Sequence, residues 1–120
     1  MDEITKEMLT FRNQMKLYHW KTALYSRHKT SDKFLSLMDE HIDKFIEVLS
    51  GSRNSRPRDN FKIEFETLTD KTVMDYLENF KGWLVDSLPG MLFEHETDLL
   101  NLRDEILSDL NRVLYLFRLK

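Results

Sequence analysis

Apolar side chains recur every three or four residues along most of the chain, and this period is the feature that most restricts its fold. The first run comprises Ile4, Met8, Phe11, Met15, Tyr18, Thr22 and Tyr25. A period near 3.6 residues gathers such side chains on one face of an α-helix, whereas a half-buried strand alternates every second residue. The sequence therefore predicts an all-α protein whose first helix covers residues 2–27.

The same period returns in three later stretches. It predicts helices over residues 32–50, 70–88 and 97–119. Residues 30–32 read Thr-Ser-Asp, which is a typical N-cap composition, and Gly51 follows the second helix as a C-terminal stop. Pro89 and Gly90 end the third helix, and Thr97 is a suitable N-cap for the fourth. We therefore expect one domain of four helices spanning residues 1–120.

The link between the second and third helices, residues 51–67, is much longer than the other two links. A helix of about 20 residues is about 30 Å long, and about 16 extended residues reach about 50 Å. The link can therefore cross the whole length of the domain, which is the one-crossover topology of ferritin-like bundles. Phe61, Ile63 and Phe65 alternate with polar residues, so we expect them to face the helices, from an extended segment or a short strand.

Several short stretches resemble one family of helical proteins. They read Tyr18-His19-Trp20, Leu49-Ser50-Gly51, Thr97-Asp98-Leu99-Leu100 and Leu114-Tyr115-Leu116-Phe117-Arg118. On these stretches the chain resembles the ferritin-like superfamily, and within it the Dps-type mini-ferritins. The resemblance implies a ferritin-like four-helix bundle with one long crossover, assembled from identical subunits into an oligomer. It also implies iron binding and a ferroxidase activity that converts Fe(II) to Fe(III).

The resemblance further implies that iron is held between subunits, by helix one of one copy and helix two of its neighbour. His19 occupies the position of the first histidine ligand, while the position of the second holds Ser31. Asp39 and Asp43 have the four-residue spacing of the carboxylate ligands, and Glu47 lies one turn further on. The resemblance thus implies an incomplete metal site of His19, Asp39, Asp43 and Glu47. The alternative is an interfacial histidine beside solvated acids.

Other histidines and acids are weaker metal candidates. A di-iron centre inside one bundle needs Glu-x-x-His on two helices, and no histidine of this chain has a glutamate three residues before it. Asp32 is either a further ligand or a first-turn acid at a helix N-terminus. His41 lies on the opposite edge of the second helix from Asp39. The cluster Glu94-His95-Glu96 with Asp98 is expected to be a solvated turn rather than a metal site.

The crossover is basic although the chain carries a net charge of −3. Its cationic side chains are Arg53, Arg56, Arg58 and Lys62. They predict an anion-binding loop for a phosphate, a nucleic acid or an acidic partner surface, and the alternative is a mobile loop kept soluble by its charge. The negative net charge argues against nucleic-acid binding by the surface as a whole.

The remaining features bear on compartment and partners. The chain has no cysteine, which excludes disulfides and thiolate chemistry. No apolar run approaches the roughly 18 residues of a membrane span, and the acidic start lacks a signal sequence. We therefore expect a cytoplasmic protein, whether cellular or associated with a virus. A second stripe of Leu17, Trp20 and Leu24 predicts a partner surface, and thus a homo-oligomer that is at least a dimer through helices one and two.

Two functions are compatible with these observations. The first is a Dps-like, oligomeric iron-binding protein or ferroxidase with an incomplete site. The second is a non-catalytic helical interaction or structural module, for example a subunit of a viral or cellular assembly, that has lost metal chemistry. Ser31 in place of the second histidine favours the second function. Hydrolase and kinase functions have no support, because the chain lacks their phosphate-binding and nucleophile motifs.

Overall fold

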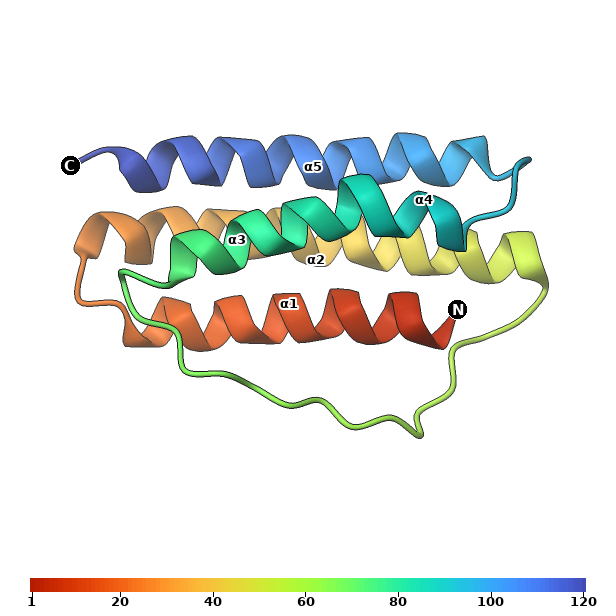
Figure 1. The fold of residues 1–120 in the computed structure, drawn as a ribbon, viewed down its shortest axis with the longest axis horizontal. Helices are drawn as coiled ribbons and strands as arrows, with labels where there is room; N and C mark the ends of the chain where they lie inside the picture. The colour runs from red at the N-terminus through yellow and green to blue at the C-terminus, as the bar shows by residue number, and fades with distance from the viewer.

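Four helical rods lie side by side in the computed structural model, which describes residues 1–120 (Figure 1). The third rod is composite, because a π-helical turn interrupts it. The elements are α1 (Asp2–Lys21), α2 (Tyr25–Arg53), α3 (Val73–Gly82), the π-helical turn η1 (Trp83–Ser87), α4 (Leu88–Met91) and α5 (Thr97–Arg118). There is no strand. The predicted all-α class is therefore confirmed.

The connections fix how the rods are arranged. Short turns join α1 to α2 and α4 to α5, whereas residues 54–72 form a long connection from α2 to α3 (Figure 1). This connection runs from the C-terminal end of α2 to the opposite end of the molecule, past the outer side of α1. α2 packs against both α1 and α5, and α3 packs against α5. None of the helices is both long and apolar enough to cross a lipid bilayer.

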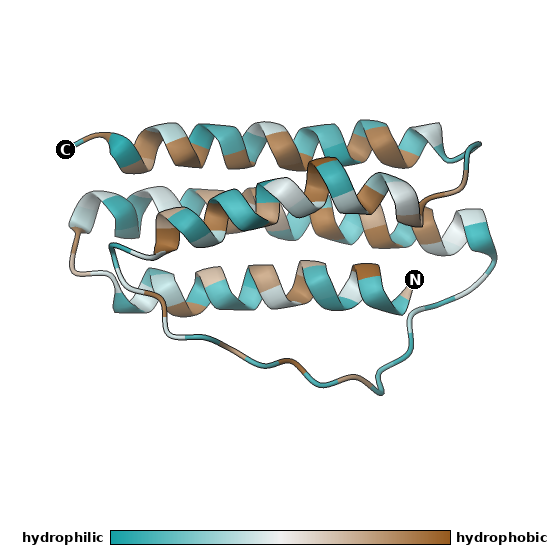
Figure 2. Cartoon of the chain, in the orientation of Figure 1, coloured by the Kyte–Doolittle hydropathy of each residue, from teal (hydrophilic) through white to brown (hydrophobic).

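The apolar stripes of the helices form one continuous core. Every apolar residue predicted for the first stripe up to Tyr18 is buried, and Figure 2 shows apolar bands on the helices with hydrophilic residues between them. Phe11 of α1 stacks on Phe80 of α3, with ring centroids 3.7 Å apart and planes 7° from parallel. Phe34 from α2 lies nearly perpendicular to the same Phe11 ring, with centroids 6.0 Å apart. Aromatic contacts therefore join three of the rods at mid-length.

The first helix is shorter than predicted. It ends at Lys21 rather than at residue 27, and α2 begins at Tyr25, so residues 30–32 lie inside α2 and are not its N-cap. The break is held from outside the segment, because the Thr22 hydroxyl and the Ala23 N–H both donate to the carboxylate of Asp70. Asp70 lies 48 residues beyond Thr22 in the chain. The turn is thus a product of tertiary structure.

The second helix continues past its predicted stop. Gly51 is helical, α2 ends at Arg53, and Asn54 adopts the left-handed conformation with φ 45° and ψ 48°. The Ser55 N–H donates to the Ser50 carbonyl at 3.1 Å, which closes the last turn. Asparagine tolerates the left-handed region better than other residues with a Cβ. The helix therefore stops at Asn54, and the expectation that Gly51 ends it was wrong.

The third rod runs past Pro89 instead of stopping at it. Proline has no N–H, and its ring clashes with the carbonyl four residues earlier in an α-helix. The π-turn η1 resolves this conflict, because the Leu88 N–H bonds to the Trp83 carbonyl five residues back. The Leu84 carbonyl is then left without a helical donor, and Nη1 of Arg103 from α5 donates to it at 2.9 Å. A side chain from a neighbouring helix thus completes the wide turn.

The middle of the long connection is held by a polar and an apolar contact, between the Arg58–Asp2 pair and the Asp70 hydrogen bonds at its two ends. The buried amide of Gln14 donates to the Glu66 carbonyl at 2.7 Å and accepts from the Glu66 N–H at 3.0 Å. Leu68 is buried in the core, while Phe61 and Ile63 are half-buried. Phe65 lies beside Leu17 and Trp20 of α1 but is 50% exposed, so it is not packed under the connection as the other two are. A side-chain amide, rather than a neighbouring strand, satisfies the backbone here.

Candidate functional site

His19 is buried near the end of α1, against the second turn of α2. Its Nδ1 lies 2.7 Å from Oγ of Ser31, and the Ser31 hydroxyl donates to the His28 carbonyl at 3.1 Å. A serine hydroxyl has one hydrogen, so Oγ of Ser31 must accept from Nδ1–H of His19. The other ring nitrogen of the neutral imidazole, Nε2, therefore carries a lone pair.

The surroundings of His19 keep its ring neutral and its Nε2 available. Burial first, and then the neighbouring charges of His28 and Lys16, lower the pKa of His19 below its ordinary value of 6.5. The His28 ring stacks on it with centroids 4.1 Å apart. Nε2 of His19 lies 3.9 Å from Oδ1 of the exposed Asp32. This pair of facing acceptors can take up a proton or a cation between them.

The acids of the second helix lie apart from His19 within one chain. Arg12 of α1 holds Asp39 through two hydrogen bonds, from Nε to Oδ1 at 2.7 Å and from Nη2 to Oδ2 at 3.1 Å. Asp43 and Glu47 are exposed on α2. No group of three histidine, aspartate or glutamate side chains is placed to hold a metal ion within one chain. A shared site between two copies stays a prediction.

The four cations of the crossover do not converge on one point. Arg53 belongs to α2 and bonds to the buried Glu96, and Arg58 pairs with Asp2, with Nε 2.7 Å from Oδ2. Arg56 and Lys62 are exposed. Two of the four predicted anion-binding side chains thus have carboxylate partners in the same chain.

The turn before α5 contains a buried carboxylate, that of Glu96. Glu96 is 1% exposed and accepts hydrogen bonds from Arg53, Ser52 and the Phe93 N–H. The guanidinium of Arg53, with the Phe93 N–H and the Ser52 hydroxyl, outweighs the effect of burial and lowers the pKa of Glu96 to about 2. The expectation of a solvated turn was therefore wrong for Glu96, although Glu94, His95 and Asp98 are exposed.

His41 joins α2 to α5 rather than to the acids of its own helix. Its Nδ1 lies 2.7 Å from Oδ2 of Asp109, and its Nε2 lies 3.3 Å from Oε2 of Glu105. Nδ1 and Oδ2 are enclosed and have no other polar partner. The two acids are one helical turn apart on α5, so they flank the ring from both sides. The predicted separation of His41 from Asp39 agrees with this placement.

Residues 19–117 match a family described as a family of unknown function, DUF5856. The chain belongs to DUF5856. No curated protein matches the sequence, and no solved structure matches it.

The DUF5856 match begins at His19 and ends at Phe117, so it takes in α2, the composite third rod and almost all of α5. The contacts of His19 with Ser31 and of Arg53 with Glu96 lie wholly inside the matched region. The Arg12–Asp39 pair joins it to a part of α1 that lies outside. Two of these three polar contacts therefore lie entirely within the part of the chain that matches the family.

Sequence analysis missed the polar network at the α1–α2 end of this DUF5856 chain. The Tyr18 hydroxyl donates to Oδ1 of Asp70 at 2.7 Å, and Arg27 donates to the carbonyls of Asp70 at 2.6 Å and Phe117 at 3.0 Å. Burial acts to raise the pKa of Asp70, but hydrogen bonds from Thr22 and Tyr18 outweigh it and lower the pKa. No local pattern indicates this network, because its members come from four separate segments.

Proposed function

We propose that this chain is a ferritin-like four-helix bundle that acts as a non-enzymatic interaction module and self-associates through the α1–α2 end. One observation carries the proposal. Trp20, Leu24 and Tyr25 are 65%, 44% and 72% exposed at the turn between these helices. Contiguous exposed apolar side chains on a small protein mark an interaction surface. The four rods and the long connection of residues 54–72 support the ferritin-like topology.

The surface also has a shape suited to a second copy. Leu17, Trp20 and Phe65 line a hollow of about 210 Å³ beside the protruding aromatic residues. A two-fold interface uses the same patch on both subunits, and a projection beside a hollow makes such a patch self-complementary. Lys16 extends the apolar area, because its Nζ lies 5.2 Å from the centroid of the Trp20 ring. This agrees with the predicted dimer through helices one and two.

The predicted metal ligands Asp39 and His19 already form hydrogen bonds within the chain. These bonds favour the interaction module over a ferroxidase. Arg12 forms a bidentate pair with Asp39, which offsets the negative charge that a ferrous ion would require there. Nδ1 of His19 is bound to Ser31, which leaves only Nε2 for a metal. A ferroxidase site would have to break the Arg12–Asp39 pair before Asp39 could act as a ligand.

A second candidate is an iron site that two subunits share. The specific observation in its favour is the lone pair on Nε2 of His19, 3.9 Å from the carboxylate of Asp32. An imidazole nitrogen and a carboxylate oxygen suit Fe(II). In this candidate His19 and Asp32 bind Fe(II) as substrate, and helix-two acids of the neighbouring copy, such as Asp43 and Glu47, complete the set.

Solution mass tests the proposed self-association. Sedimentation velocity over a range of concentrations should show a dimer or larger species, and Trp20→Ser should shift the population to monomer. Val85→Ser is the control, since Val85 is 44% exposed on η1 in the third rod, outside the α1–α2 turn. A monomer at every concentration, or an equal effect of both variants, would contradict the proposal.

Aerobic titration with Fe(II) separates the two candidates. The proposal expects no ferric absorbance above that of buffer. The informative variant is His19→Asn, because the amide keeps a donor for Ser31 but removes the Nε2 lone pair. Saturable oxidation by the unmodified protein that disappears in His19→Asn would establish the iron site instead.

A further inference from the structure

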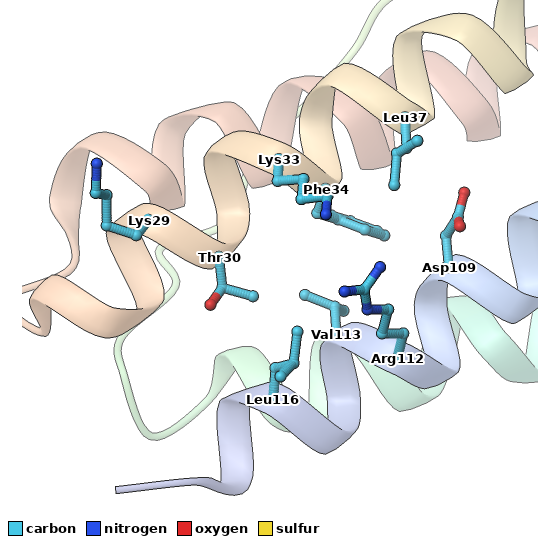
Figure 3. A pocket seen from close by; sticks show the side chains of 9 residues that line it. All are labelled: Lys29, Thr30, Lys33, Phe34, Leu37, Asp109, Arg112, Val113 and Leu116. Atoms are coloured by element: carbon cyan, nitrogen blue, oxygen red, sulfur yellow. The ribbon is translucent and has the colours of Figure 1, made fainter.

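A groove lies between α2 and α5 near the N-terminal end of α2. Its volume is about 240 Å³. Figure 3 shows Thr30 and Phe34 of α2 and Val113 and Leu116 of α5 pointing into the space between the two helices. Phe34 and Val113 are buried, while Leu116 is half-buried. The floor of the groove is therefore apolar and belongs to the edge of the core.

The rim of the groove carries unpaired positive charge. Lys29, Lys33 and Arg112 line it, all three are exposed, and none forms an ion pair within the chain. Asp109 is the only acid in the lining, and its Oδ2 lies 2.7 Å from Nδ1 of His41. The acid that would offset these cations is thus already in contact with another side chain. A groove with this charge selects an anionic partner.

The dimensions of the groove identify the kind of partner. The lining of α2 runs from Lys29 to Leu37, which is about 12 Å or two turns of helix. Pockets that bury small molecules usually exceed about 300 Å³ and enclose most of the ligand, whereas this one is smaller and has exposed side chains at its rim. The fold has no strand and so no sheet edge to receive an extended peptide. A helix laid between α2 and α5 fits these limits.

We propose that the groove binds an acidic amphipathic helix of a partner protein. The apolar stripe of that helix packs on Phe34, Val113 and Leu116. Its carboxylates, one turn apart beside the stripe, face Lys29, Lys33 and Arg112. The groove adjoins the surface of the proposed self-association, because Nζ of Lys29 lies 5.8 Å from the centroid of the Tyr25 ring. Its lining contains none of the exposed residues of that surface, Trp20, Leu24 and Tyr25.

A designed peptide tests the groove directly. The probe is a helix-stabilised peptide with a leucine stripe flanked by glutamates, and fluorescence anisotropy follows its binding to the full chain. Its partner probe has lysine at every glutamate position. We expect saturable binding of the glutamate peptide only. Lys33→Glu/Arg112→Glu should weaken it about tenfold or more, which corresponds to about 1.4 kcal/mol.

Two further variants separate specific contacts from general charge. Lys44→Glu/Lys71→Glu changes the net charge equally at exposed positions outside the groove, and it should leave the affinity within about twofold. Leu116→Ser should weaken the glutamate peptide through lost apolar contact, with an unchanged circular dichroism spectrum. Equal binding of the two peptides, equal loss in both charge-reversal variants, or no saturable binding of the glutamate peptide would each overturn the proposal. Saturable binding of decanoate with no binding of the peptide would assign the groove to small amphiphiles instead.

Discussion

The guanidinium of Arg53 and the carboxylate of Glu96 meet where α2 ends and α5 begins, with Nη2 and Oε1 3.0 Å apart. The same Nη2 donates to the Met91 carbonyl at 2.8 Å, and the Arg53 guanidinium carbon lies 4.2 Å from the centroid of the Phe93 ring. The turn from α4 to α5 is thus fastened to the last turn of α2. The carboxylate has no exposure to solvent, so its charge depends on these donors.

We predict that Glu96→Gln lowers the free energy of unfolding by about 3 kcal/mol, because a buried charge loses its partner. Urea unfolding followed by circular dichroism measures the change. Arg53→Met should cost at least as much, and the double variant should cost clearly less than the sum of the two. Glu94→Gln is the control, since Glu94 is an exposed neighbour in the same turn. Additive losses would mean that Arg53 and Glu96 act independently.

The Arg53–Glu96 pair makes part of the free energy of unfolding depend on pH. The pKa of Glu96 is about 2 in the folded protein, below its ordinary value of 4.5. The unfolded chain therefore takes up a proton on this group before the folded protein does. The stabilisation is complete above pH 4.5 and is lost as the pH falls through about 2. The difference in unfolding free energy between wild type and Glu96→Gln should shrink over that window and stay constant from pH 5 to 8.

Two residues at the end of α2, Gly51 and Asn54, should change the stability in opposite directions when each is replaced by alanine. Gly51 is helical, has no positive φ, and has no atom within 4 Å of an added Cβ, so Gly51→Ala should stabilise the protein by about 0.5–1 kcal/mol. Asn54 is left-handed, so Asn54→Ala should destabilise it by about 1 kcal/mol, whereas Asn54→Gly should be tolerated. Chemical denaturation of the three variants checks the order. A loss in Gly51→Ala would place the helix stop at Gly51 after all.

The π-turn predicts coupling between Pro89 and Arg103. Arg103→Met should cost about 1–2 kcal/mol, because the Leu84 carbonyl loses its donor inside the protein. In a Pro89→Ala background the helix regains an N–H and can return to α geometry, so Arg103→Met should then cost much less. A double-mutant cycle of unfolding free energies measures this coupling. Asp104→Asn is the control for the exposed ion pair of Arg103, and it should be nearly neutral.

The helices were predictable because the apolar spacing that indicates them is local in the sequence. Ile4, Met8, Phe11 and Met15 are all buried, as their spacing predicted. The helix ends were less predictable, since Thr22 stops α1 through Asp70, and Pro89 is accommodated through Arg103. These partners lie far away in the sequence, and no start or stop signal encodes them.

The candidate site was predictable only in part for the same reason. Spacing placed His19 at the border of two surfaces, and it lies there, buried against Ser31. The Arg12–Asp39 pair joins residues 27 positions apart, and no pattern on α2 announces it. Glu96 was misjudged because its sequence neighbours are polar, although its partner Arg53 is 43 residues away.

The hydrogen bonds from Thr22 and Ala23 to Asp70 mean that residues 1–53 contain only some of the contacts that hold their own turn, such as that of His19 with Ser31. In a fragment without Asp70, the apolar period that continues to Tyr25 is free to prolong the first helix beyond Lys21. The hairpin of α1 and α2 therefore takes its final shape only when the long connection has docked. The final geometry of this turn is accordingly expected to form in the same cooperative transition as the rest of the fold.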